Sequence, residues 1–75
     1  MKRRKPRPYW CLLTRETPSD KWGMAFGDHD RSIVAFERTD YRQSYTAKNL
    51  AIISAESARA KSVQAAIDAL NQKAA

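Results

Sequence analysis

The sequence predicts a small α+β domain in which three strands and two helices follow the order β-β-α-β-α. Two short apolar runs near the N-terminus are separated by a polar, Pro-containing connection, which is typical of a β-hairpin. A helical pattern, a third apolar run and an Ala-rich amphipathic segment follow. The simplest arrangement is a three-stranded, antiparallel-type sheet with the first strand in the middle and both helices packed on one face.

Residues 1–8 precede the first strand, and we expect them to form a flexible basic arm. Five of the first seven residues are cationic: Lys2, Arg3, Arg4, Lys5 and Arg7. The chain has a formal net charge of +6 from 14 Lys and Arg against 8 Asp and Glu, so the arm supplies most of the excess. Repelling charges, two prolines and the lack of an apolar pattern favour an extended, mobile segment.

The predicted hairpin joins a strand at residues 9–14 to a strand at residues 22–27 through the connection at residues 15–21. Large and small residues alternate in the second strand. We therefore expect one bulky face and one nearly bare face, formed respectively by Trp22, Met24 and Phe26 and by Gly23, Ala25 and Gly27. A domain of this size has few large apolar residues with which to build a core. Phe26 and at least one tryptophan are therefore expected in the core.

The first helix is predicted at residues 30–42, because Asp28 and Asp30 are helix-start residues. Ile33, Phe36 or Glu37, and Tyr41 follow at helical spacing. A strand over Ile33 to Phe36 remains an open alternative, because this run is apolar and partly β-branched.

The C-terminal part is predicted to contain a short buried strand at residues 50–53 after an irregular stretch at residues 43–48. Ser57 or Ser62 then caps a last helix, whose apolar stripe comprises Val63, Ala66, Ile67 and Leu70. We expect this helix to end at Asn71 and residues 73–75 to fray. Residues 9–72 would form the single globular domain.

The segment from Trp22 to Arg31 reads W-x-x-x-F-G-D-H-D-R and resembles small uncharacterised bacteriophage proteins. The resemblance extends over roughly residues 20–72 and leaves the basic arm outside. It implies a phage origin and hence the cytoplasm of a bacterial host, and it implies no catalytic residue. The single cysteine, Cys11, also favours a reducing, intracellular setting.

Neither catalysis nor a metal site is expected. Asp28, Asp30 and Ser32 imitate the start of a calcium loop, but Ile33 replaces its turn glycine and Thr39 replaces its bidentate Glu. The only histidine, His29, has no nucleophile beside it in the sequence. Cys11 lies in a predicted strand and is expected to be a small buried hydrophobe. The sequence indicates no enzyme and no cofactor.

Binding is the expected activity, and the charge distribution indicates an anionic partner. The leading hypothesis is a nucleic acid, contacted mainly at its phosphates by the arm, with Arg59 and Lys61 at the start of the last helix extending the basic surface. The alternative is a phage effector that binds an acidic host protein and modulates it. In either case an exposed Trp10 or Trp22 could stack on a base or dock on a protein.

The length of 75 residues permits one domain close to the lower size limit for folding without a disulfide or a metal. A homodimer is therefore a possible way to add stability. No apolar run approaches the roughly 18 residues that a membrane span requires, so no membrane partner is expected.

Overall fold

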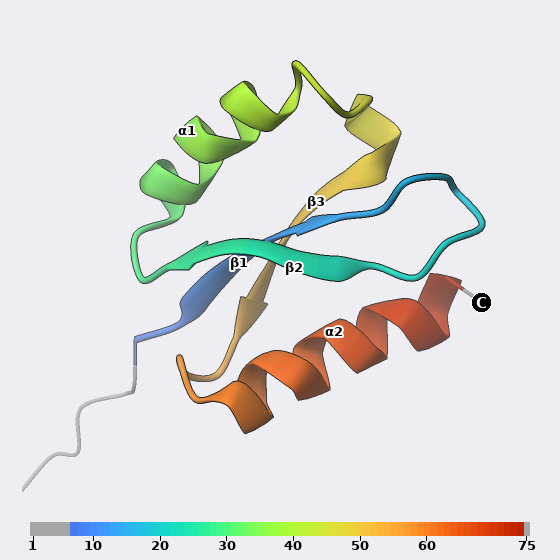
Figure 1. Cartoon of the computed structure of the whole chain (residues 1–75). Coiled ribbons are helices and arrows are strands. Elements are labelled where there is room, and N and C mark those ends of the chain that lie inside the picture. The colour runs from blue at the N-terminus through green and yellow to red at the C-terminus, as the bar shows by residue number, and fades with distance from the viewer. Residues whose placement is uncertain (1–6, 75) are drawn as a thin grey trace, which may run out of the picture.

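The computed structural model describes residues 7–74 and shows the α+β fold that the sequence predicts (Figure 1). The helices and strands are β1 (Tyr9–Thr14), β2 (Gly23–Asp28), α1 (Arg31–Tyr41), β3 (Leu50–Ala55) and α2 (Ala60–Ala74), with a short 3₁₀ turn, η1 (Ala47–Asn49), before β3. The strand order β2-β1-β3 confirms the prediction of a central first strand, and β1 is antiparallel to both neighbours. All but the last two residues of the predicted arm lie outside the described residues.

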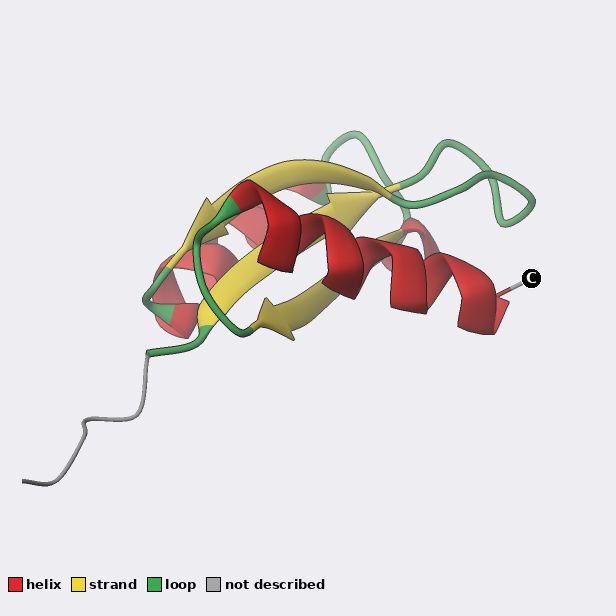
Figure 2. Ribbon diagram, turned by 90° about the horizontal axis from the view of Figure 1, so that it is seen from below, coloured by secondary structure: helices red, strands yellow, loops and turns green. Residues whose placement is uncertain are grey.

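The prediction that both helices pack on one face is wrong, because α1 and α2 cover opposite faces of the sheet (Figures 1 and 2). The central strand explains the difference. Cys11 and Leu13 are fully buried on the side of α2, and Leu12 is fully buried on the side of α1. A strand that is apolar on both faces needs cover on both, and a second helix supplies it.

The predicted alternation of bulky and bare residues in β2 is also wrong, because a bulge interrupts this strand. Leu12 pairs with Phe26, but the next residue, Leu13, pairs with Met24, so Ala25 is the extra residue. An extra residue shifts the face on which later side chains lie. Phe26 consequently packs with Ala25 in the cluster beneath α1, and Met24 lies opposite Leu13 on the other face.

Residues 31–41 form the predicted helix and not the alternative strand. Asp30 is its N-cap, because its carboxylate accepts a hydrogen bond from the Ser32 N–H at 2.9 Å. Its buried face differs from the predicted one. Val34 is fully buried on the sheet, whereas Phe36 is 70% exposed.

The last helix continues past the predicted end at Asn71 to Ala74. Asn71 does not cap the helix; its side-chain amide is bonded to the backbone of Trp22. At the other end, the Ser57 hydroxyl accepts from the Arg59 N–H at 3.3 Å, while Ser62 lies in the first turn. The predicted stripe does face the sheet, with Ile67 buried.

The connection between β1 and β2 is held by Arg15, at the end of β1. Its guanidinium donates to the carbonyl oxygens of Lys48 at 2.9 Å and Pro18 at 3.3 Å, and Nε donates to Asn49 Oδ1 at 3.2 Å. The guanidinium carbon also lies 4.3 Å from the centre of the Trp22 ring. A single side chain thus joins three segments at this end of the sheet.

Candidate functional site

Exposed basic residues gather at the end of the sheet where β1 begins. Pairing of Tyr9 with Ala55 and of Trp10 with Asp28 brings the start of β1 beside the ends of β3 and β2. Both helices begin shortly after those strands end, so their first residues lie at the same end of the molecule (Figure 1). We call the exposed cations there the cationic end: Arg7, Arg31, Arg59 and Lys61.

The cationic end contains three of the predicted site residues and one that sequence reasoning missed. Arg7, Arg59 and Lys61 were predicted, but Arg31 was not. It begins α1 directly after the strand that pairs with β1, so the predicted β-β-α order already contained the signal. The remaining predicted arm residues, Lys2 to Lys5, lie outside the described residues.

Three acidic side chains lie at the same end: exposed Glu56, which follows β3, and Asp28 and Asp30, which are engaged in local hydrogen bonds. Asp28 Oδ1 accepts from the Asp30 N–H at 2.8 Å, and Asp30 Oδ1 accepts from both the N–H and the hydroxyl of Ser32. The Ser32 hydroxyl and N–H, and more weakly Arg7, lower the pKa of Asp30. Asp28 and Asp30 order the turn into α1 through these hydrogen bonds.

Trp10 lies half-buried beside the cationic end. Its ring packs against the cluster of Leu12, Val34 and Leu50 beneath α1. The Arg31 guanidinium carbon lies 5.5 Å from the centre of the ring, which is within the range of a cation–π contact. Trp10 therefore presents only part of its ring, together with a cation.

Trp22, the second predicted stacking or docking residue, belongs to the core. It is 9% exposed and packs with Cys11, Leu13 and Ile67. Arg15 covers its ring, so this indole presents no open face for a base or a partner protein. Phe26 is half-buried in the cluster on the other side of the sheet.

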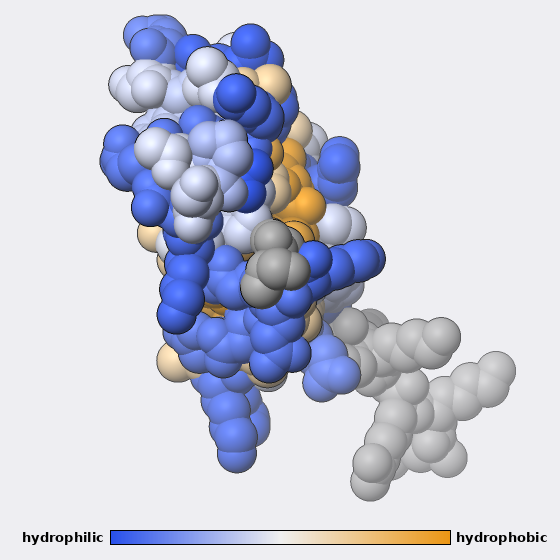
Figure 3. Space-filling view, turned by 90° about the vertical axis from the view of Figure 1, so that its right-hand side faces the viewer, coloured by the Kyte–Doolittle hydropathy of each residue, from blue (hydrophilic) through white to orange (hydrophobic). Residues whose placement is uncertain are grey.

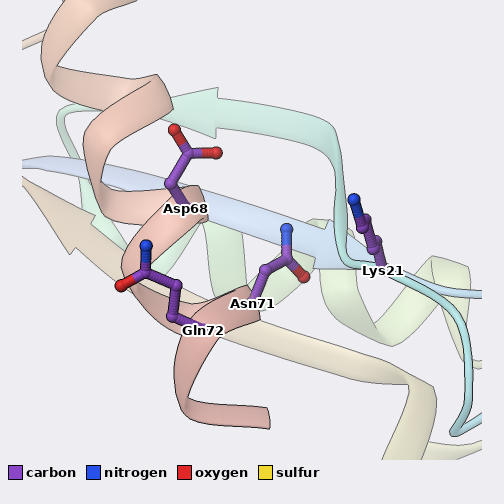
Figure 4. A pocket seen from close by; sticks show the side chains of 4 residues that line it. All are labelled: Lys21, Asp68, Asn71 and Gln72. Atoms are coloured by element: carbon purple, nitrogen blue, oxygen red, sulfur yellow. The ribbon is translucent and has the colours of Figure 1, made fainter. Parts of the chain in front are cut away.

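A surface hollow of about 360 Å³ lies between the C-terminal half of α2 and the β1–β2 connection (Figure 4). Its lining includes Lys21, Asp68, Asn71 and Gln72. The Asn71 amide is already engaged: Oδ1 accepts from the Trp22 N–H at 2.7 Å, and Nδ2 donates to the Trp22 carbonyl at 3.3 Å. Among the described residues that line the hollow, Lys21 supplies a cation and Asp68 a carboxylate beside the amides of Asn71 and Gln72, and no nucleophile is paired with a base.

The groups considered for metal binding or catalysis are dispersed or buried. Within residues 7–74, no three His, Cys, Asp or Glu side chains are placed to hold a metal ion together. His29 makes an edge-on contact with Tyr9, at 5.0 Å between ring centres. Burial raises the pKa of the Cys11 thiol, so its reactive thiolate form is disfavoured.

A second exposed feature is apolar and lies on the outer face of α1. Phe36 is 70% exposed and Ile33 is 44% exposed, and these two residues stand one helical turn apart.

Neither helix in the described part of the chain has the length and apolar character needed to cross a bilayer.

Comparisons with known protein families, with curated proteins and with solved structures found no match to this chain.

Proposed function

We propose that this chain is a small non-catalytic module that binds nucleic acid mainly through its phosphates. The observation that carries the proposal is the cationic end, where four exposed basic side chains gather beside the point at which β1 begins. Residues 2–5 of the arm add four cations and precede Arg7 by at most five residues. Chain length alone keeps them within about 18 Å of Arg7.

Phosphate contact is the mode that these side chains support best. Lys and Arg neutralise phosphates and release counterions, which gives affinity without reading the bases. The half-buried Trp10 beside Arg31 offers a restricted site for stacking on an unpaired base. The resemblance to phage proteins and the single cysteine support the cytoplasm of a bacterial host as the setting.

The salt dependence of DNA binding tests this proposal. Five arm cations that each neutralise one phosphate contribute roughly −4.5 to the slope of log affinity against log salt on duplex DNA, and Arg59 and Lys61 steepen it to about −6.3 if they also contact phosphates. Replacing Lys2, Arg3, Arg4 and Lys5 by Gln should flatten this slope by about 3.6. Replacing Arg59 and Lys61 by Gln should flatten it by about 1.8 if the cationic end takes part.

The matched control replaces Arg42 and Lys73, which are both exposed, by Gln. It removes the same charge as the Arg59 and Lys61 change, but at the opposite end of the molecule. It should leave the slope nearly unchanged, and scrambling the DNA sequence should change the affinity little. Absence of binding at about 50 mM salt, where phosphate contacts are strong, would refute the proposal.

The exposed pair Ile33 and Phe36 favours a second candidate function, in which the chain binds and modulates an acidic host protein. Aromatic side chains that become desolvated in an interface contribute most of its affinity, whereas flexible charges mainly speed encounter. In that case Phe36→Ala should raise the dissociation rate of the complex by tenfold or more, on the order of 1.4 kcal/mol. A stoichiometric host protein that is retained after nuclease treatment would favour this candidate over nucleic acid.

A further inference from the structure

The strand β3 forms an open border of the sheet. In the described part of the chain β1 is its only neighbouring strand, and Figure 2 shows β3 at the border opposite to β2. The helix α2 packs on one face of β3, whereas α1 lies mainly over β1 and β2. The outer border of β3 and part of its α1 face are therefore uncovered.

The hydrogen-bonding pattern shows which backbone groups point outward. The Arg15 N–H donates to the Asn49 carbonyl at 3.1 Å, and this pair continues the register of β1 with β3. Hydrogen-bonded pairs alternate along an antiparallel ladder, so Ala51 and Ile53 bond to β1. Ile52 and Ser54 consequently direct their N–H and C=O groups away from the sheet.

The border also lacks the features that prevent strands from pairing. From Leu50 to Ala55, β3 has no charged residue, no proline and no bulge in its pairing with β1. Ile52 and Ile53 are only half-buried, and Figure 3 shows apolar side chains gathered on the β3 side between more hydrophilic surroundings. An uncharged, apolar edge strand is a template for another strand.

We propose that β3 pairs with β3 of a second copy of this chain to form a continuous six-stranded antiparallel sheet. In the symmetric register, Ile52 faces Ile52 of the second copy, and their N–H and C=O groups exchange hydrogen bonds. The Ser54 N–H donates to the Leu50 carbonyl of the second copy. The Leu50 N–H is already bonded to Ala47, so this register uses the groups that remain free.

The charges that flank β3 identify a second copy as the partner. Exposed Lys48 precedes the strand and exposed Glu56 follows it. Antiparallel self-pairing around Ile52 brings the η1 turn of each copy, which contains Lys48, to the end at which Glu56 of the other copy follows β3. An unrelated peptide need not have an acidic and a basic residue at the positions that complement Lys48 and Glu56. The pairing is independent of the proposed nucleic-acid contacts.

A charge exchange tests both the interface and its register. Sedimentation equilibrium of the full chain at about 150 mM salt, where exposed charges are screened beyond about 8 Å, should show a dimer. Lys48→Glu and Glu56→Lys each turn two attractive pairs into repulsive ones and should weaken dimerisation by about tenfold or more. The double variant restores the attraction with reversed polarity and should return to within about threefold of the unaltered chain.

Lys21→Glu makes the same charge change as Lys48→Glu in the exposed β1–β2 connection and should leave the dimer intact. Amide hydrogen exchange supplies a second measurement, which does not depend on charge. The Ile52 and Ser54 amides should become protected as the protein concentration rises, whereas the Ile53 amide should be protected throughout. A monomer at about 100 µM with unprotected Ile52 and Ser54 amides would overturn the proposal. So would a dimer that neither charge change affects.

Discussion

Arg15 and Asn71 hold the β1–β2 connection against the rest of the domain, each by contacts to backbone groups. Arg15 ties it to η1 and covers Trp22, and Asn71 reaches across from α2 to both polar groups of the Trp22 backbone. The eight residues between β1 and β2 form no helix or strand. Hydrogen bonds from the Arg15 and Asn71 side chains therefore hold this connection in place, as backbone hydrogen bonds would in a strand.

Asn71→Ala should destabilise the domain by about 1–3 kcal/mol, because it leaves the N–H and C=O of Trp22 without their partners. Gln72→Ala is the matched control, since Gln72 is an exposed neighbour that lines the same hollow. It should change stability by no more than about 0.5 kcal/mol. Urea unfolding of both variants measures the difference, and equal stabilities would contradict the role given to Asn71.

Asp30→Ala should lower the melting temperature at neutral pH, because the helix loses its cap. The lowered pKa of Asp30 determines the pH dependence of this effect. The stabilisation is fully present above the unfolded pKa, near about 3.9, and it is lost as the pH falls through the lowered folded pKa. The difference from the unaltered chain should therefore shrink in acid. Asp30→Asn, which keeps a capping oxygen, should lose less stability at pH 7.

At the scale of the elements, the two helices bury different amounts of apolar surface. In α2 the stripe around Ile67 packs on Cys11, Leu13 and Trp22. In α1 only Val34 is fully buried, and the large side chains of Ile33 and Phe36 face outward. We therefore expect α2 to contribute more of the packing energy.

Ile67→Ala should cost about 2–5 kcal/mol of folding free energy, which in a domain of this size is enough to unfold it. Phe36→Ala removes a larger side chain but should change stability by no more than about 0.5 kcal/mol, because Phe36 is 70% exposed. Thermal unfolding followed by circular dichroism compares the two. A Phe36→Ala variant that unfolds as readily as Ile67→Ala would show that α1 packs differently.

The order and type of the elements could be predicted from the sequence because each has a local pattern. The faces could not, since they depend on pairing between distant segments. The bulge at Ala25 is visible only in the pairing of β2 with β1, in which the successive residues Leu12 and Leu13 pair with Phe26 and Met24. The last helix was likewise predicted to end at Asn71. The hydrogen bond between Asn71 and Trp22 spans 49 positions, so no local pattern in the sequence indicates it. Of the candidate site, the arm, Arg59 and Lys61 were predicted, and Arg31 was missed although the predicted β-β-α order placed it beside the start of the first strand.

For the whole molecule, the charges and the core lie in different parts of the chain. The two apolar clusters consist of residues from Tyr9 onward, whereas residues 2–5 supply four of the net six positive charges. Binding and stability should therefore respond separately to changes in the arm.

Removing residues 1–6 should leave the free energy of unfolding unchanged within about 0.5 kcal/mol, because the clusters formed by residues 7–74 keep every side chain. The same truncation should weaken DNA binding at about 50 mM salt by more than tenfold, through lost counterion release. Denaturant unfolding and a DNA titration on one preparation measure both effects. A large loss of stability would show that the arm packs on the domain.

The bulge in β2 has a consequence for how far association can proceed. A chain with two equivalent open borders could add copies without end, by joining the border of one molecule to the opposite border of the next. Here the borders differ: the bulge at Ala25 disrupts the regular spacing of β2, whereas β3 pairs with β1 without interruption. Once two β3 strands have joined, only bulged borders remain outside. Growth would then end at two copies, and a fibre would not form.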